Sequence, residues 1–489
     1  MSSSLHPARS TCVDQELDLR IGGTFERGRG PDFPVYNPAT EEVVAEVAEA
    51  SPAQIDRAAA IARAGLDRDE MGDAKERSAA LDRLADVFEA RADELLAVSV
   101  NEIGTPVSTA QGLHVDTPIS VLRWMAQATL IDRTEHLGVF PGPPASDSKV
   151  IYRPAGVIAG IAAYNYPLLF AAIKVGAAYA AGCPSILLSS PNAPLGILNF
   201  GRYVQEAGWP ESSVSVLAGG VDAAQHLISR PEVAKVSFTG SVPAGRAVMA
   251  TAAEGLRDVV LELGGKSAAI VLPSADAESV VEPIHSRYLR NAGQGCASPT
   301  RILLHRAQLD AFLAASRAYF ESVPVGDPWD TRTLVGPVIS ERHRASVLGH
   351  IDNALSDGGT VLARGHEPQG AGWWVPPTLI GGLGNDARCN QEEIFGPVAS
   401  VQTYDTIDEA VAIANDSTFG LHATVWGPHD EAMELAPRLD VGQVSINGGG
   451  PKRPDAPNGG WKNSGIGREF GEAGIREFLE PVHIQWPVK

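Results

Sequence analysis

The sequence predicts an α/β protein built around a parallel β-sheet that helices cover on both faces. From about residue 150, short apolar runs alternate with segments long enough to form helices. These runs lack the alternation of apolar and polar residues that marks a strand with one face in water, so they suit strands of a doubly wound sheet. The expected strands span residues 157–163, 185–188, 214–217, 233–238 and 259–263.

Helices precede this sheet, and a second α/β region follows it. Ser51-Pro52-Ala53-Gln54 has the pattern of a capping box with proline at the first helical position. The segment 138–153, rich in proline and serine, is predicted to leave the domain as a hairpin used between subunits. Residues 267–457 form the second region, with strands expected at 268–272, 301–304 and 441–446. Buried positions are expected in a first helix at Ile55, Ala58, Ala59, Ala62 and Leu66, and in a second helix at Leu81, Leu84, Phe88 and Leu95.

Composition narrows the class of protein and of partner. A chain of 489 residues exceeds what one hydrophobic core organises, so two or three joined domains are expected. The 59 acidic and 39 basic residues give a net charge of -20, which argues against nucleic acid and anionic membranes as partners. Residues 1–20 lack the apolar core of a secretory signal, and the longest near-apolar stretch, 168–181, is too short to span a bilayer. We therefore predict a cytoplasmic protein.

The cysteines point to a reducing compartment and to one candidate nucleophile. Cys12, Cys183, Cys296 and Cys389 show neither metal-ligand spacing nor a disulfide framework, so no metal site is predicted. Cys296 ends the segment Asn291-Ala292-Gly293-Gln294-Gly295-Cys296, whose glycines let the backbone approach a ligand and leave a thiol accessible. Because an isolated cysteine is more often a small buried hydrophobe, this segment alone leaves both interpretations open.

A carboxylate stands at the end of a predicted strand, in Leu261-Glu262-Leu263-Gly264-Gly265-Lys266. Burial disfavours the charged form and raises the pKa of a carboxyl, which suits a general base near neutral pH. The two glycines that follow permit a close backbone approach. The alternative is a structural carboxylate paired with Lys266.

Two strand-to-helix junctions carry further candidates. Asn165 follows the first core strand in Ala163-Tyr164-Asn165-Tyr166-Pro167, where its amide either points into a crevice or caps the next helix. Phe238-Thr239-Gly240-Ser241, followed by Gly245, places a glycine-bearing turn before a helix. Backbone N–H groups and the helix dipole favour phosphate at such a turn.

Taken together, these segments resemble the aldehyde dehydrogenase superfamily, in its non-acylating type, from about residue 21 to the C-terminus. The most specific parts are the glutamate motif 261–266 and the cysteine motif 293–296. Further matching segments are Glu392-Glu393-Ile394-Phe395-Gly396-Pro397, Asn415 with Phe419-Gly420-Leu421, and Lys462-Asn463-Ser464-Gly465-Ile466-Gly467-Arg468-Glu469.

The resemblance implies a fold and an activity. The fold would be aldehyde dehydrogenase-like, with a Rossmann-like cofactor domain, an α/β catalytic domain and a β oligomerisation arm. The activity would be NAD(P)-dependent oxidation of an aldehyde, in which Cys296 attacks the carbonyl, Asn165 holds the oxyanion and Glu262 activates the water that releases the acid. Relatives that pass the acyl group to coenzyme A generally do not need this base, so water is the expected acceptor. The expected domains are 1–137 with 154–261 for the cofactor, 262–457 for catalysis, and 138–153 with 472–489 for the arm and C-terminal strand.

The resemblance also implies a cofactor site. Glu393 would hold the nicotinamide ribose, Phe395 would support the nicotinamide ring, and the turn at Gly240 would face the pyrophosphate. Lys174 and Glu469 match family positions that support the site, with a structural ion pair as the alternative. The expected cofactor-binding residues are Ile161, Ala163, Tyr164, Ser189, Gly220, Phe238, Gly240, Ser241, Gly245, Leu263, Gly264, Glu393 and Phe395.

Two departures from the family pattern bear on the cofactor. Leu188 and Pro191 stand where the family has a lysine and a glutamate for the adenosine ribose. The first change removes a donor, and the second removes a group that would repel the extra phosphate of NADP. We predict weakened or unusual cofactor affinity, with NAD modestly ahead of NADP and with neutral hydrogen bonds from Ser189 and Ser190 to either cofactor. An esterase or thioester hydrolase with weak or lost cofactor binding is the alternative, and a non-catalytic family member is a third hypothesis.

Substrate and assembly are less strongly encoded. Small residues flank the nucleophile, which predicts a roomy, largely apolar pocket for aliphatic or aromatic aldehydes. The tail 475–489 resembles a family strand that pairs with the 138–153 excursion across a subunit interface, so we predict a homodimer or homotetramer. The expected pocket residues are Tyr166, Leu169, Phe170, Ile173, Gly295, Ala297 and Asn458.

Overall fold

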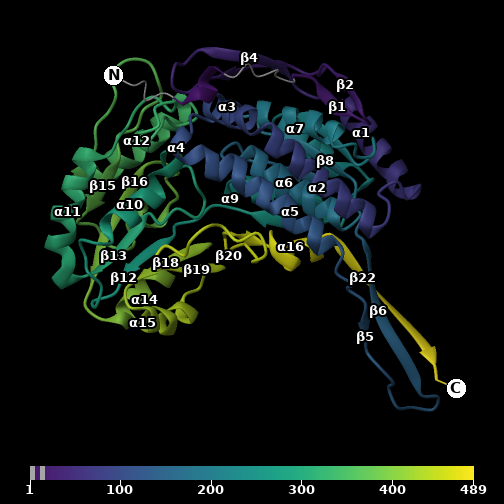
Figure 1. The fold of residues 1–489 in the computed structure, drawn as a ribbon. Helices are drawn as coiled ribbons and strands as arrows, with labels where there is room; N and C mark the ends of the chain where they lie inside the picture. The colour runs from purple at the N-terminus through teal and green to yellow at the C-terminus, as the bar shows by residue number, and fades with distance from the viewer. Residues whose placement is uncertain (1–5, 11–16, 489) are drawn as a thin grey trace.

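The computed structural model describes residues 6–10 and 17–488, so the predictions on Cys12 and on much of the segment 1–20 lie outside the described residues. The predicted α/β class is confirmed. Two α/β lobes lie side by side, and a β-arm projects away from both (Figure 1). Among the described residues, no helix has both the length and the apolar character needed to span a bilayer.

The first sheet has the strand order β2-β1-β9-β8-β7-β10-β11-β21. Its central strands, from β9 to β11, are mutually parallel. Every residue of β7, β8 and β9 is buried, which is why these strands appear in the sequence as unbroken apolar runs. The strands are β1 (Leu19–Ile21), β2 (Thr24–Glu26), β7 (Val157–Ile161), β8 (Ser185–Ser189), β9 (Val214–Ala218), β10 (Val233–Thr239), β11 (Asp258–Glu262) and β21 (Gly465–Ile466).

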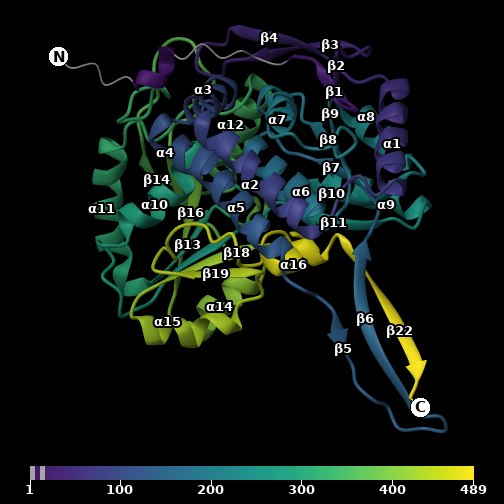
Figure 2. The same ribbon diagram turned by 45° about the vertical axis from the view of Figure 1, so that its right-hand side comes forward.

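Helices cover both faces of this sheet, as predicted. Figure 2 shows α1, α8 and α9 on one side of the strands and α2, α6 and α7 on the other. The predicted capping box is confirmed: the Ser51 side chain accepts a hydrogen bond from the backbone N–H of Gln54, and the Gln54 side chain accepts one from the backbone N–H of Ser51. The helices are α1 (Pro52–Asp67), α2 (Ala74–Ala90), α3 (Ala92–Ile103), α4 (Val107–Ala110), α5 (Thr117–Thr129), α6 (Pro167–Ala180), α7 (Leu195–Glu206), α8 (Val221–Ser229) and α9 (Val242–Glu254).

The prediction of a single second helix is wrong. Arg91, at φ -112° and ψ 23°, ends α2 and also precedes the first residue of α3. The stripe Leu81, Leu84, Phe88 and Leu95 is buried as expected, but Leu95 belongs to α3. The apolar spacing continues across the break, so the pattern alone could not reveal it.

The second sheet has the order β14-β15-β16-β13-β12-β18-β19, and all neighbours are parallel except β14 and β15. The three predicted strands of this region are confirmed as β12, β13 and β19. The strands are β12 (Ala268–Val271), β13 (Arg301–His305), β14 (Thr360–Arg364), β15 (Thr378–Gly381), β16 (Val398–Tyr404), β18 (His422–Trp426) and β19 (Gln443–Ile446). The helices are α10 (Val281–Leu289), α11 (Leu309–Ser322), α12 (Glu341–Ser356), α13 (Arg388–Gln391), α14 (Ile407–Asn415) and α15 (His429–Leu435). Two further sheets each contain two short strands: β3 (Asp32–Tyr36) pairs with β4 (Val43–Ala48), and β17 (Phe419–Gly420) pairs with β20 (Trp461–Lys462).

The arm is a three-stranded sheet of β5 (Glu135–His136), β6 (Ser146–Pro154) and β22 (Leu479–Pro487). β22 runs antiparallel to β6 along its full length, from Leu479 opposite Pro154 to Pro487 opposite Ser146. The expectation that the tail pairs with this segment across a subunit interface is therefore wrong, because both strands belong to one chain. The short helix α16 (Gly471–Arg476) turns the chain so that the tail meets its own excursion.

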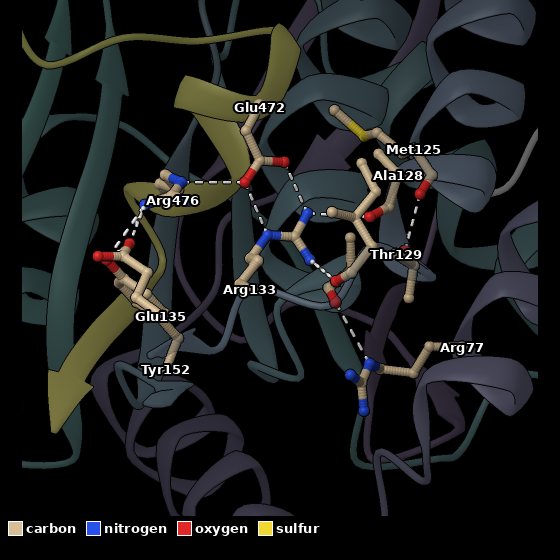
Figure 3. Close-up of polar contacts among 11 residues, drawn as sticks. Arg77, Met125, Ala128, Thr129, Arg133, Glu135, Tyr152, Glu472 and Arg476 are labelled. Atoms are coloured by element: carbon tan, nitrogen blue, oxygen red, sulfur yellow. Dashed lines mark hydrogen bonds and ion pairs between the residues drawn. The ribbon is translucent and has the colours of Figure 1, made fainter. Parts of the chain in front are cut away.

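Ion pairs hold the root of the arm (Figure 3). Arg133, after α5, donates to both carboxylate oxygens of Glu472 in α16 at 2.8 Å. Arg476 donates to Glu472 at 3.0 Å and to the hydroxyl of Tyr152 in β6 at 3.1 Å. Tyr152 in turn donates to Glu135 of β5 at 2.8 Å. This network ties α5, α16 and the arm strands into one unit.

Candidate active site

Two cavities meet at Cys296. The first, about 660 Å³, lies beyond the carboxyl ends of β7, β8, β10 and β11, where parallel α/β sheets bind ligands. We call it the sheet-end cavity. The second, about 630 Å³, is lined by the start of α6, by the end of α10 and by residues 449–453. We call it the loop cavity.

The backbone before Cys296 is strained. Asn291 and the two residues after it have φ values of 51°, 52° and 76°, in the left-handed region that only glycine enters freely. Thr105 donates a 2.6 Å hydrogen bond to Oδ1 of Asn291, and Nδ2 of Asn291 donates to the carbonyl oxygen of Asn165 at 3.2 Å. Such strain persists only where the surroundings over-determine the conformation, typically at functional sites.

Two glycines of the glutamate motif bring three segments together. A Cβ on Gly265 would lie 2.5 Å from the carbonyl oxygen of Cys296, and a Cβ on Gly264 would lie 2.2 Å from Oε2 of Glu393. Both distances are shorter than any tolerated contact, so no other residue type fits without displacement. The Gly265 N–H also donates to Oε1 of Glu393 at 3.0 Å. The motifs that the sequence separates by more than a hundred residues are therefore in direct contact.

Glu262 is buried at the end of β11, opposite Gly465 of β21. Neither of its carboxyl oxygens accepts a hydrogen bond of ordinary geometry within the described residues, but the Cys296 thiol lies close enough to act as a hydrogen-bonding neighbour. Burial raises the pKa of Glu262 to about 8, the nearby charge of Glu469 adds to the rise, and the Cys296 thiol acts in the opposite direction. Glu469 itself forms an ion pair with the buried ammonium of Lys174 at 2.8 Å. The two residues that match supporting positions of the family are therefore paired next to the candidate base. Glu262 does not pair with Lys266 in this structure.

The Cys296 thiol is partly buried and responds to its charged neighbours. Burial raises its pKa, and the carboxyl groups of Glu262 and Glu393 raise it further. The ammonium of Lys452 acts in the opposite direction. The resting thiol is therefore neutral near pH 7, and a base has to accept its proton when it reacts.

Asn165 is buried beside this loop. Its Nδ2 donates to the carbonyl oxygen of Gln294 at 3.0 Å. The residue at the start of α6 is Tyr166, and that helix end has no side-chain cap. The capping alternative for Asn165 is therefore wrong, and one of its two amide protons stays available to a ligand.

Three aromatic rings form one wall of the sheet-end cavity. The ring centroids of Tyr164, His343 and Phe395 lie 6.0 to 6.4 Å apart in edge-on contacts. Phe395 has a φ of 56°, and a Cβ on Gly293 would lie 2.0 Å from the carbonyl oxygen of Gly396. The cysteine loop thus packs against the loop that carries Glu393 and Phe395.

Most residues expected around the cofactor line the sheet-end cavity. They are Ile161, Ala163, Tyr164, Ser189, Gly220, Phe238, Gly240, Ser241, Gly264, Glu393 and Phe395, joined by Leu188, Ser190 and Pro191. Gly245 and Leu263 are absent from this lining, because they pack on each other: a Cβ on Gly245 would lie 2.6 Å from the Leu263 side chain. Sequence reasoning missed Arg342 and His343 at the start of α12, since no local motif marks them.

The loop cavity differs from the predicted pocket. Tyr166, Leu169, Gly295 and Ala297 line it as expected. Phe170 and Ile173 do not, because they point into the hydrophobic core and are 5% and 2% exposed. Asn458 does not line it either, and instead accepts a 2.9 Å hydrogen bond from Lys452. The expectation of a largely apolar pocket is wrong on the opposite wall, where sequence reasoning missed Arg287, Arg290, Lys452 and Arg453.

The model of the aldehyde dehydrogenase family matches residues 25–484. The chain belongs to the aldehyde dehydrogenase family. The match confirms the resemblance drawn from the sequence motifs and covers both sheets and most of the arm. It makes the chain an oxidoreductase that acts on aldehydes with a nicotinamide cofactor.

Individual relatives agree with this membership. Geranial dehydrogenase of Castellaniella defragrans is 38% identical over 450 residues, which cover 90% of this chain and 92% of that protein. The structure of betaine aldehyde dehydrogenase from Staphylococcus aureus with NAD+ has a TM-score of 0.93 and 30% identity, and the match covers 96% of this chain and 95% of that one. A cysteine-to-alanine mutant of aldehyde dehydrogenase C from Pseudomonas syringae, with NAD+ and octanal, has a TM-score of 0.91, 35% identity and 97% and 98% coverage.

The contact at Gly265 gives a testable prediction for this aldehyde dehydrogenase. Gly265→Ala pushes a methyl group against the Cys296 carbonyl oxygen, so we expect a loss of about 1–3 kcal/mol in the free energy of unfolding. We also expect slower alkylation of Cys296 by iodoacetamide, measured by peptide mass spectrometry.

The matched control is Gly349→Ala in α12, where a Cβ meets nothing within 4 Å. This variant should keep the wild-type alkylation rate and gain stability of up to about 1 kcal/mol. Alkylation of Cys296 at the wild-type rate in Gly265→Ala would contradict the assigned contact.

Proposed function

We propose that this protein oxidises an aldehyde to the carboxylic acid with NAD+, through a thioester on Cys296 that water hydrolyses. The main support is one thiol at the meeting point of two cavities, with a buried carboxyl of raised pKa beside it. Two ligands can approach this sulfur from different sides, as a reaction between an aldehyde and a dinucleotide requires.

The sheet-end cavity suits a dinucleotide. Gly220 and Gly240 line it where the backbone can approach phosphate, and Ser241 begins α9, whose free N–H groups favour an anion. The buried hydroxyls of Ser189 and Thr239 line the cavity and have no hydrogen-bond partner among the described residues. When bound there, NAD+ supplies the hydride acceptor. Glu393 and Phe395 would hold its nicotinamide end, next to Cys296.

Cys296 acts as the nucleophile. Its sulfur attacks the aldehyde carbonyl, and the proton of the neutral thiol passes to the neighbouring Glu262 in its ionised form as the C–S bond forms. The resulting oxyanion would be stabilised by the remaining amide proton of Asn165 and by the backbone N–H of Cys296. The strained loop fixes both donors before substrate binds, so they need not reorganise during the reaction.

Glu262 serves as the general base for hydrolysis. Its carboxyl lies beside the sulfur that carries the acyl group, and its raised pKa allows it to hold and release a proton near neutral pH. The ion pair of Lys174 and Glu469 lies next to it and shapes its charge. The products are the carboxylic acid and the free thiol.

NAD is the preferred cofactor in this proposal. Pro191 lines the adenosine end of the cavity and offers no carboxylate there, but Glu49 from the loop after β4 lies beside it. A Cβ on Gly220 would lie 3.3 Å from Oε1 of Glu49 and 3.9 Å from the Pro191 ring. This carboxylate would repel the additional phosphate of NADP.

A second candidate function rests on the same end of the cavity. Leu188 and Pro191 line it with apolar groups that give the ribose no donor. If the cofactor binds too weakly to react, the thiol and base would still hydrolyse esters or thioesters.

Cofactor binding and turnover test the proposal. We expect calorimetry to give tighter binding of NAD+ than of NADP+, and hexanal to yield reduced cofactor by absorbance. Cys296→Ala should abolish turnover while leaving NAD+ binding intact, because the cavity walls stay the same. Absence of cofactor binding together with Cys296-dependent ester hydrolysis would favour the second candidate.

The pKa of Glu262 predicts the pH profile. Because the ionised form is the base, kcat should rise with pH up to a plateau above about 8. Glu262→Gln should lower kcat by about 100-fold or more and remove this rise with pH.

Folding raises the pKa of the Glu262 carboxyl, so its ionisation opposes folding as pH rises toward 8. The thermal midpoint of Glu262→Gln at pH 8 should therefore not fall, and a lower midpoint with an unchanged profile would contradict the assignment.

We propose a homo-oligomer assembled through the arm. Leu137, Val139 and Phe140 of the arm are 59%, 60% and 74% exposed, and the β22 side chains Ile484 and Trp486 are also exposed. Apolar groups gathered on a projecting sheet indicate a protein interface. Deleting residues 481–489 removes the β22 edge, and should lower the mass measured by light scattering. An unchanged mass would contradict an arm-mediated assembly.

The domain division stays part of this proposal. The cofactor domain comprises 1–137 and 154–261, the catalytic domain 262–457, and the arm with the C-terminal strand 138–153 and 472–489. Separate hydrophobic clusters behind the two sheets support the division between the two larger domains.

A further inference from the structure

The loop cavity carries an excess of positive charge. Its lining includes Arg287, Arg290, Lys452 and Arg453, and no aspartate or glutamate is part of that lining. The chain as a whole has a net charge of -20, so this concentration of cations runs against its composition. A cavity lined by one sign of charge concentrates ligands of the opposite sign.

Two of these cations lack a carboxylate partner on the same wall. Arg290 forms no ion pair within the described residues and is half-buried, and its charge lowers the pKa of the Tyr166 hydroxyl. Arg287 donates to the carbonyl oxygen of Gly448, which leaves its charge uncompensated. Burial lowers the pKa of Arg287, and the charge of Arg290 lowers it further. Arg287 and Arg290 thus lie close enough to affect each other, and within the described residues neither forms an ion pair.

Lys452 extends this charge to the reacting sulfur. Its Nζ donates to Asn458 at 2.9 Å and lies 4.6 Å from the centre of the Phe470 ring, and neither partner is an anion. Burial lowers the pKa of Lys452, whereas the Cys296 thiol and the carboxyl groups of Glu262 and Glu469 raise it, so these acidic neighbours partly compensate its charge. Lys452 therefore places a positive charge close enough to Cys296 to act on its thiol, and Arg287 is close enough to act on Lys452.

Two carboxylates lie in segments that line the cavity without being part of its lining, and each accepts hydrogen bonds. Asp455 accepts two hydrogen bonds from the exposed guanidinium of Arg453. Asp116 accepts from the amide of Gln111 at 2.8 Å. Within the described residues, Arg287 and Arg290 form no ion pair, and no carboxyl group acts on the pKa of Arg287. Tyr166 and Leu169 of the same lining can contact a short carbon chain.

We propose that the substrate is an aldehyde with an oxyanion at its far end, which Arg287 and Arg290 bind while Cys296, with Lys452 nearby, attacks the carbonyl. This inference rests on the proposed function and names its substrate class. For a carboxylate substrate the balanced reaction is the aldehyde acid, NAD+ and water giving a dicarboxylate, NADH and two protons. Neither the cationic substrate named for the Staphylococcus aureus structure nor the neutral aldehydes of the other two relatives needs such a wall.

Matched substrates test the inference on the wild-type enzyme. We expect 4-oxobutanoate to have a kcat/KM at least about tenfold above that of butanal, which has the same chain length without the charge. We expect added NaCl to lower the value for 4-oxobutanoate and to leave that for butanal unchanged, because salt screens the attraction. Betaine aldehyde should be the poorest substrate. A further assay with 3-oxopropyl phosphate as substrate distinguishes a phosphate from a carboxylate as the preferred oxyanion.

Variants separate charge recognition from structural effects. Arg290→Gln should raise KM for the preferred anionic aldehyde about tenfold or more, while the KM for butanal changes less than about twofold. The matched control is Arg306→Gln, which removes a surface guanidinium paired with Asp405 and should change neither KM. Equal kcat/KM for charged and neutral aldehydes in the wild type would overturn the inference, as would an equal shift of both in Arg290→Gln.

Binding without turnover separates this inference from the proposed function. Calorimetry with Cys296→Ala and glutarate should show binding that Arg290→Gln weakens, because glutarate resembles a dicarboxylate product. NADH formation from butanal at the same efficiency as from 4-oxobutanoate, with no glutarate binding, refutes the anionic substrate and leaves the dehydrogenase intact. Glutarate binding with no NADH from any aldehyde refutes the dehydrogenase and keeps the anion site.

Discussion

The active site depends on the close contact of three backbone segments that only glycine permits. Gly265 lies against the carbonyl oxygen of Cys296, Gly264 lies against the carboxylate of Glu393, and Gly293 lies against the carbonyl oxygen of Gly396. The two contacts with backbone carbonyl oxygens leave no space for a Cβ, whereas that of Gly264 is with the end of the Glu393 side chain. The nucleophile, the base and the loop with Glu393 are thereby fixed relative to one another before any ligand binds, which is the condition for efficient positioning.

Around this contact the protein arranges charge in two ways. Glu262 is buried with no hydrogen bond of ordinary geometry at its carboxyl within the described residues, and burial raises its pKa toward the working pH. The loop cavity holds the opposite charge in a form open to a ligand, on Arg287 and Arg290. The first feature suits proton transfer and the second suits substrate recognition, and Cys296 lines both cavities.

The central strands β7 to β11 could be predicted because they are buried on both faces, and burial on both faces leaves an unbroken apolar run in the sequence. The break at Arg91 could not, since apolar spacing continues across it and neither proline nor glycine marks it. The sequence predicted the correct partner segment for the C-terminal tail, but it wrongly placed the two strands in different chains. Two strands match equally well within one chain or between two chains. Here the turn at α16 brings the tail back to β6 of its own chain.

The sequence by itself determined the family, the candidate nucleophile Cys296 and the candidate base Glu262, because these lie in short motifs whose spacing is local. The tertiary structure decided which side chains face the cavities. Phe170 and Ile173 share a helix with the expected pocket wall, yet the rotation of α6 directs them into the core. Arg290 and Lys452 come from distant segments and meet only after folding. A motif records neighbours along the chain, whereas the charge of a cavity depends on which remote segments the packing brings together.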